Sequence, residues 1–115
     1  IMEEIVERPW GTYQTILRGE TYQVKKIVVF PNSQLSLQSH NKRSEHWVIV
    51  EGEGTIAVGK KEIKAKKDDS IYIPVQEKHR MSNFTNEKVV FIEVQNGDYL
   101  GEDDIIRYED IYGRI

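Results

Sequence analysis

The sequence contains no cysteine among its 115 residues. Disulfide bonds, thiol nucleophiles and thiolate metal ligands are therefore excluded together. The chain also lacks a long apolar run, and residues 1–7 alternate acidic and apolar types without the basic region of a signal peptide. These absences predict a cytoplasmic protein that does not associate with a membrane.

Positive charge is in the minority, because 19 acidic residues face 16 basic ones and the formal net charge is -3. With a pI near 5.6, the chain as a whole does not attract nucleic acid, and none is expected as a partner. A local basic pocket for a small anion is still compatible with this balance. The length and a hydrophobic content of 38% predict one domain, residues 1–115, with a single core.

Short runs of β-branched and aromatic residues, separated by Gly, Pro, Asn and Asp, predict a fold made of strands. The expected strands are 12–17, 22–30, 35–40, 45–51, 54–58, 61–65, 70–73, 79–83 and 89–95. Many short antiparallel strands are typical of an all-β barrel or sandwich. Residues 101–104 are predicted to start a short helix, because three carboxylates would suit its positive end.

All three histidines of the chain lie in two short segments, residues 37–47 and 74–79. Gln38 and His40 are two apart, so both project from one face of a strand. Glu45 opens the next apolar run, and we expect a turn to return it beside the first strand, while His79 arrives from another strand pair. One amide oxygen, two imidazoles and one carboxylate form a ligand set for a divalent metal. Zinc is expected first, with manganese, cobalt, nickel or iron as alternatives.

These segments resemble the two sequence motifs of the cupins. Residues 32–52 follow the first motif, with Asn32 in place of a glycine and Gln38 in place of its first histidine. Residues 68–83 follow the second motif, with Asp68 and Gln76 in place of glycines. The resemblance implies a single-domain double-stranded β-helix, a jelly-roll barrel, with short N- and C-terminal extensions.

A closer resemblance is to the C-terminal isomerase domain of type II phosphomannose isomerases, which in many bacteria follows a mannose-1-phosphate guanylyltransferase domain. The resemblance implies a metal-dependent isomerase that interconverts mannose 6-phosphate and fructose 6-phosphate by proton transfer through an enediolate. No Gly-rich phosphate cradle occurs, so guanylyl transfer is not expected. The matching segments are residues 7–11, 35–38, 43–47, 72–74, 93–95, 97–107 and 110–114.

The resemblance also assigns roles to individual residues. The metal, held by Gln38, His40, Glu45 and His79, would polarise the sugar oxygens. Arg43, Lys42 and Arg107 are the expected catalytic residues. Arg8, Lys25, Arg43 and Arg107 are expected to bind the sugar phosphate, since fixed cations suit a phosphate. The base is open between Lys42, His46 and Glu93.

Other interpretations compete with the isomerase. Where the family has Met-His-His-His-Arg, residues 39–43 read Ser-His-Asn-Lys-Arg, and two histidines are lost. A non-catalytic sugar- or sugar-phosphate-binding cupin is therefore an alternative, as are a metal-dependent cupin oxygenase and a metal-free sugar-nucleotide epimerase. His46, next to Glu45, should point to the opposite face, and Arg8 could belong to a packed N-terminal arm. Ile1, Ile5 and Val6, together with exposed strand edges, predict a homodimer.

Overall fold

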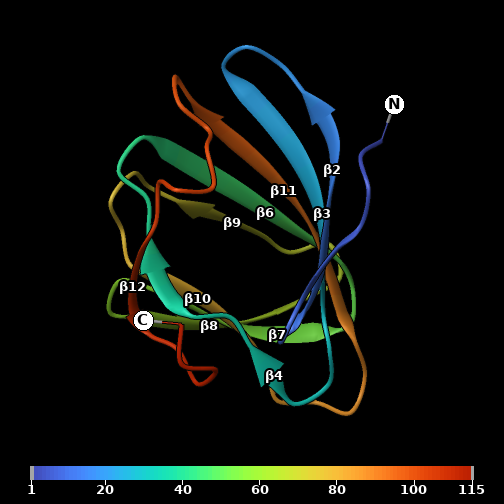
Figure 1. Ribbon diagram of the computed structural model, residues 1–115. Coiled ribbons are helices and arrows are strands. Elements are labelled where there is room, and N and C mark those ends of the chain that lie inside the picture. The colour runs from blue at the N-terminus through green and yellow to red at the C-terminus, as the bar shows by residue number, and fades with distance from the viewer. Residues whose placement is uncertain (1, 115) are drawn as a thin grey trace.

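The computed structural model describes residues 2–114, which form twelve strands and no helix. The strands are β1 (Val6–Arg8), β2 (Gly11–Arg18), β3 (Tyr22–Val29), β4 (Ser33–Gln34), β5 (Leu37–Ser39), β6 (Arg43–Glu51), β7 (Glu53–Val58), β8 (Lys61–Lys66), β9 (Ser70–Ile73), β10 (His79–Asn83), β11 (Val89–Gly97) and β12 (Ile106–Glu109). They build two antiparallel sheets that face each other (Figure 1). The all-β prediction is confirmed.

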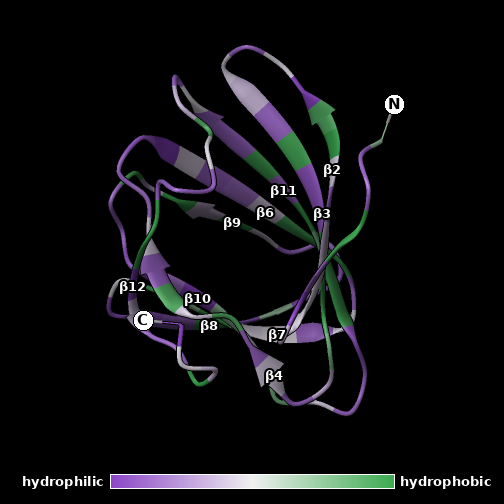
Figure 2. Cartoon of the chain, viewed as in Figure 1, coloured by the Kyte–Doolittle hydropathy of each residue, from purple (hydrophilic) through white to green (hydrophobic). Residues whose placement is uncertain are grey.

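Sheet A has the order β1-β2-β3-β11-β6-β9, and sheet B has the order β12-β5-β10-β7-β8 with β4 also paired to β10. Neighbours in sheet A come from both ends of the chain, since β11 lies between β3 and β6. Burial alternates along β3 and β6, where every second side chain is buried, although both strands carry hydrophilic as well as hydrophobic residues (Figure 2). This period of two gives each strand one face toward the interior and one toward solvent.

The interior changes from apolar to polar along the barrel. The inward rows across β6, β11 and β3 are Ile49, Phe91 and Ile27; then Trp47, Glu93 and Lys25; then Glu45, Gln95 and Gln23. All nine side chains are buried. Apolar burial in the first row, continued by Ile56 and Met81 of sheet B, provides the main stabilisation. The third row leaves polar groups inside the barrel, and it is there that a functional site is to be sought.

Three residues that replace glycines of the cupin motifs adopt backbone angles that glycine favours. Asn32, Asp68 and Gln76 have φ values of 55°, 79° and 69°. Asn and Asp tolerate this left-handed region better than most residues, whereas Gln76 does so at a larger steric cost. Its N–H donates to the carbonyl oxygen of His40 at 2.8 Å, which ties the loop before β10 to the segment before β6.

The helix predicted to begin at residues 101–104 is wrong. These residues form a turn in which the N–H of Asp104 donates to the carbonyl oxygen of Gly101 at 3.1 Å, and β12 follows. The carboxylates that suggested a helix start bind elsewhere: Asp104 accepts from the backbone N–H groups of Asn41 and Lys42 at 2.9 Å each. Of the predicted strand 35–40, only residues 37–39 form a strand, β5, and His40 lies just beyond its end.

Within residues 2–114, no helix is long and apolar enough to cross a membrane.

Candidate metal centre and anion-binding cavity

A cavity of about 200 Å³ opens at the polar end of the barrel, between the two sheets. Sheet A contributes Glu45 from β6 and Lys25 from β3, and sheet B contributes His79 from β10 and Gln38 from β5. Residues distant in the sequence meet there because, after β3, the chain crosses repeatedly from one sheet to the other. The cavity therefore collects side chains from residues 8–47 and 79–114, whereas residues 48–78 do not line it.

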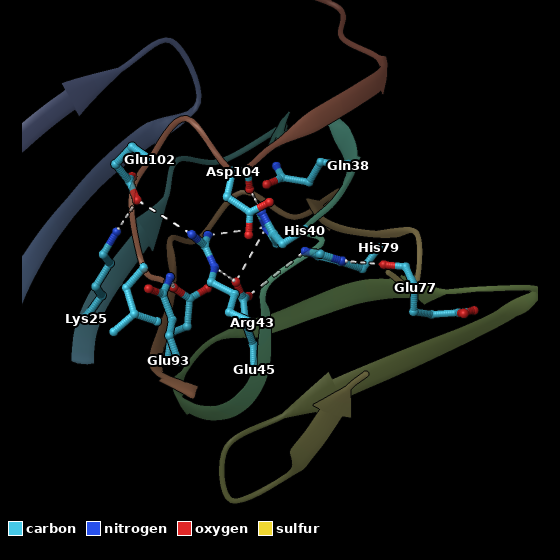
Figure 3. A network of polar contacts seen from close by, with 12 residues as sticks. Lys25, Gln38, His40, Arg43, Glu45, Glu77, His79, Glu93, Glu102 and Asp104 are labelled. Atoms are coloured by element: carbon cyan, nitrogen blue, oxygen red, sulfur yellow. Dashed lines mark hydrogen bonds and ion pairs between the residues drawn. The ribbon is translucent and has the colours of Figure 1, made fainter. Parts of the chain in front are cut away.

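His40, Glu45 and His79 converge on one point of this cavity (Figure 3). Nε2 of His40 lies 3.4 Å from Oε2 of Glu45, and Nε2 of His79 lies 4.0 Å from Oε1 of the same carboxylate. The candidate ligand atoms all lie within 4.8 Å of one another. All three side chains are buried, so water competes little for these atoms. The spacing is that of a small cluster that could surround one ion.

The backbone fixes which nitrogen of each imidazole faces the carboxylate. Nδ1 of His40 lies 2.6 Å from the carbonyl oxygen of Asp104, and Nδ1 of His79 lies 2.9 Å from that of Glu77. A carbonyl oxygen only accepts, so each Nδ1 carries the proton and each Nε2 keeps its lone pair. Metal-binding histidines are oriented by the same kind of outer hydrogen bond.

Burial keeps both imidazoles neutral. It lowers the pKa of His40 to about 4, against the opposing effect of the Glu45 charge. It also lowers the pKa of His79, again with Glu45 acting in the opposite direction. Near neutral pH both rings therefore offer a lone pair rather than a second proton, which is the state that binds a metal.

Glu45 is ionised although it is buried. Burial alone would raise its pKa, but Arg43, His79 and His40 outweigh burial and lower it to about 2. Two donors hold the carboxylate: Nε of Arg43 donates to Oε2 and Nε1 of Trp47 donates to Oε1, each at 2.9 Å. An anionic oxygen between two neutral nitrogens fits a divalent cation by charge and by donor type.

Gln38 lines the cavity from the same face as His79. The two residues are directly opposite in the β5–β10 pair, and Arg107 is opposite Gln38 in the β12–β5 pair. Directly opposed residues share a face of a sheet, so these three side chains form one row. Both hydrogen bonds of the Gln38 side chain use Nε2, which donates to Ser36. The structure thus brings the four predicted metal ligands to one cavity.

The predicted phosphate-binding cations also line this cavity. Lys25 and Arg43 are buried, whereas Arg8 lies at the exposed rim with its guanidinium over the Tyr13 ring. NH1 of Arg43 and Nε of Arg107 are buried atoms without a hydrogen-bond partner among residues 2–114. Unpartnered buried donors are costly, and both arginines line the cavity that a ligand could fill.

Lys42 does not line the cavity. It precedes the inward-facing Arg43, so it points the other way, and its Nζ lies 5.0 Å from the centroid of the Tyr99 ring. This placement gives no support to the predicted catalytic role of Lys42. His46 is likewise on the outer face, as predicted, with its ring centroid 4.7 Å from that of Tyr72.

Two further arginines line the cavity that were not among the predicted site residues. Arg80 donates from Nε to the carbonyl oxygen of Leu35 at 3.1 Å. Arg114 forms an ion pair with Asp110, at 2.7 Å, and also lines the cavity. No motif signals Arg80, and only the ending of the chain, residues 110–114, signals Arg114.

A chain of buried amides leads from the cavity into sheet A. Gln23 donates from Nε2 to Oε1 of Gln95, and Gln95 donates from Nε2 to Oε1 of Glu93, both at 2.5 Å. Burial raises the pKa of Glu93 well above its ordinary value, and the neighbouring charge of Glu45 adds to this. The environment thus acts in opposite directions on two neighbouring carboxyl groups, because it lowers the pKa of Glu45 and raises that of Glu93. Figure 3 shows both beside Arg43.

A double-stranded β-barrel that carries histidines and a glutamate at its polar end defines the cupin class. The cupin-2 domain protein Rru_A2000 from Rhodospirillum rubrum superimposes with a TM-score of 0.73 at 21% identity, over 90% of this chain and 77% of that one. At this identity the likeness concerns the fold alone, and the fold prediction is confirmed.

Within that class, the chain belongs to the family described as mannose-6-phosphate isomerase C-terminal, which it matches over residues 2–110. It is 47% identical to the xanthan biosynthesis protein XanB of Xanthomonas campestris pv. campestris over 95% of this chain and 23% of that protein. It is 44% identical to the mannose-1-phosphate guanylyltransferase ManC of Salmonella typhimurium over 99% of this chain and 24% of that protein.

These relatives correct the predicted function. We expected a metal-dependent aldose-ketose isomerase, whereas the matched relatives are biosynthetic proteins of which this chain spans about a quarter. Their names refer to xanthan biosynthesis and to guanylyl transfer rather than to a stand-alone isomerase. The isomerase motifs identify the family to which the chain belongs. Membership of that family does not by itself assign an enzymatic activity to this chain.

Proposed function

We propose that this chain is a metal-dependent sugar-phosphate-binding domain of a mannose-metabolising enzyme. Gln38, His40, Glu45 and His79 would hold a divalent cation, with zinc first among the candidates and manganese, cobalt, nickel or iron as alternatives. The observation that carries the proposal is the convergence of the two Nε2 atoms on an ionised, buried Glu45. A bound cation would polarise sugar oxygens placed against it.

The ligand beside the metal is proposed to be a phosphorylated sugar. The family name points to mannose phosphates, and the cavity supplies the cations that a phosphate needs. Arg43 and Arg107 each have a buried donor atom without a protein partner, and Arg8 stands at the rim. Arginine suits this task because its planar fork of donors matches phosphate oxygens.

The metal half of the proposal is tested by titrating Zn²⁺ into chelator-treated protein by calorimetry, with Mn²⁺, Co²⁺ and Ni²⁺ for comparison. His79→Ala should weaken binding by roughly a hundredfold or more, because removing even an outer partner of a ligand costs ten- to a hundredfold. His46→Ala is the matched control, since His46 lies on the outer face. Equal affinities for the two variants would contradict the metal site.

The sugar-phosphate half is tested on zinc-loaded protein with mannose 6-phosphate and with mannose. We expect the phosphorylated sugar to bind at least roughly tenfold more tightly, because charge-assisted hydrogen bonds contribute more than neutral ones. Arg107→Gln should remove most of that difference, whereas Arg18→Gln, a change outside the cavity, should leave it intact. No preference for the phosphate would contradict the proposed ligand class.

We further propose a cytoplasmic location and a homodimer. Guanylyl transfer, for which the relative ManC is named, uses a nucleotide, which fits the cytoplasm.

The sheet edges formed by β9 and β8 are available for pairing, and Ile5 is 61% exposed. Ile1, which also suggested the dimer, lies outside the described residues. Analytical ultracentrifugation at several concentrations would separate monomer from dimer.

A further inference from the structure

The segment between β11 and β12, residues 98–105, is attached to the cavity at several points. The carbonyl oxygen of Leu100 accepts from Nε2 of Gln23 at 3.3 Å, and Asp104 binds the backbone before β6. Between these attachments, Glu102 extends its carboxylate toward Lys25 and Arg43 (Figure 3). The segment is thus held in place on both sides of Glu102. Glu102 itself lies in the loop and belongs to no strand.

Glu102 neutralises cations that are far more buried than it is. Nζ of Lys25 lies 2.8 Å from Oε2 of Glu102, and NH1 of Arg43 lies 3.9 Å from the same oxygen. The Lys25 side chain is 4% exposed, whereas that of Glu102 is 55% exposed. Among the described residues, Glu102 is the one carboxylate within 4.0 Å of Lys25. A buried ammonium needs such a partner when no ligand is present.

The pairing with Arg43 is incomplete. At 3.9 Å the contact between NH1 and Glu102 is an ion pair without a hydrogen bond, and NH1 has no other partner in the described part of the chain. Glu102 therefore binds Lys25 closely and only partly satisfies NH1 of Arg43, whose Nε is paired with Glu45. A phosphate carries more charge and three acceptor oxygens, so it could bind both cations at once.

Resting on the proposed function, we propose that Glu102 is an internal competitor of the anionic ligand. Its carboxylate occupies the Lys25–Arg43 pair, and a phosphate group takes this place by displacing the Glu102 side chain into solvent. Displacement needs only side-chain rotation, since Asp104 and Leu100 keep the segment attached. A neutral sugar cannot replace the lost charge, so Glu102 selects for anionic ligands.

The test is calorimetric titration of inorganic phosphate into wild-type protein, Glu102→Gln and Glu51→Gln. Glu51 is the matched control, because it is an exposed glutamate paired with Lys88 at 3.5 Å and does not line the cavity. We expect Glu102→Gln to bind phosphate roughly tenfold more tightly, the size of one lost charge-assisted hydrogen bond in competition. Glu51→Gln should match the wild type, and mannose should bind all three proteins equally.

Phosphate binding that is equal or weaker in Glu102→Gln than in the wild type would overturn the competitor role and leave the proposed function standing. Phosphate binding to none of the proteins would overturn both. A second measurement does not depend on the variant: in wild-type protein, phosphate should shift the NMR signals of Glu102 and leave those of Glu51 unchanged. An unperturbed Glu102 in phosphate-saturated protein would also overturn the inference.

Discussion

Trp47 donates its indole Nε1–H to Oε1 of Glu45 at 2.9 Å, from a position two residues further along the same strand. The same indole packs against Phe91 with ring centroids 4.6 Å apart and meets the His79 ring edge-on at 5.6 Å. One core residue therefore touches the apolar interior, the carboxylate and an imidazole of the candidate metal centre. Packing of the core and orientation of the site are coupled through it.

Replacing Trp47 by Phe should lower the free energy of unfolding of metal-free protein by about 2 kcal/mol more than replacing Trp10 by Phe. Both tryptophans are buried, but only Trp47 hydrogen-bonds a charged group, and such a bond contributes about 1.5–3 kcal/mol. Urea denaturation of the two variants measures the difference. Equal losses would mean that the hydrogen bond to Glu45 contributes nothing beyond packing.

Local patterns in the sequence were sufficient to predict some of the residues that line this cavity. The spacing of Gln38 and His40 predicted a shared face and the run after Glu45 predicted a strand. His40 lies just beyond the end of β5, and the structure still places Gln38, His40 and Glu45 at one cavity. His79 was included because all three histidines lie in two short segments, since no local pattern connects it to Glu45. Alternation also separated His46 from the ligands, since adjacent residues of a strand face opposite sides.

Contacts between distant segments could not be predicted in this way. The carboxylates of Glu102 and Asp104 suggested a helix start, but their partners Lys25 and Asn41 are more than sixty positions away in sequence. Tertiary partners outweigh a local preference worth less than about 1 kcal/mol per residue. The amide chain from Gln23 to Glu93 was missed for the same reason, because β3 and β11 become neighbours only in the folded sheet.

Acid should destabilise the metal-free protein in a defined range of pH. Burial lowers the pKa of His40 from 6.5 to about 4, so between these values the unfolded chain binds a proton that the folded protein does not. Stability is therefore fully present above pH 6.5 and falls as the pH decreases toward 4. A pKa shift of this size corresponds to a loss of up to about 3 kcal/mol in the free energy of unfolding, and burial lowers the pKa of His79 as well.

Urea midpoints measured between pH 7 and pH 4 would follow this loss. The variant His40→Gln keeps a polar side chain of similar reach but cannot titrate, so its stability should depend less on pH over the same range. An equally steep dependence in wild type and variant would show that other groups cause the acid sensitivity.

The buried amide chain should behave as a unit. Gln95→Leu removes the acceptor of one Gln23 N–H and the donor to Glu93, at a cost of about 1–3 kcal/mol for each group left without a partner. The other N–H of Gln23 still donates to Leu100. Adding Gln23→Leu removes one of those unpaired groups. The double variant should therefore lose less stability than the sum of the single losses, by about 1 kcal/mol or more in a double-mutant cycle by urea denaturation. Strictly additive losses of stability would contradict coupling between the buried side chains of Gln23, Gln95 and Glu93.

Asn83 should be the most sensitive polar residue outside the cavity. It is fully buried, and its Nδ2 donates to the carbonyl oxygens of Val29, Phe30 and Glu87 at 3.1, 3.1 and 2.7 Å. Its Oδ1 accepts from the backbone N–H of Thr85 at 3.0 Å. The side chain thus joins the end of β3 to the loop before β11 in place of backbone pairing.

Asn83→Ala should lower the free energy of unfolding by about 3 kcal/mol or more, because several backbone groups lose their partner in a place that water reaches poorly. Asn86→Ala is the matched control, since Asn86 is exposed and makes one long hydrogen bond with Asn32, at 3.3 Å, and its loss should stay within about 0.5 kcal/mol. Thermal and urea denaturation of both variants compare the two. Similar losses would mean that the Asn83 hydrogen bonds contribute little to stability and that apolar contacts hold the end of β3 to the loop before β11.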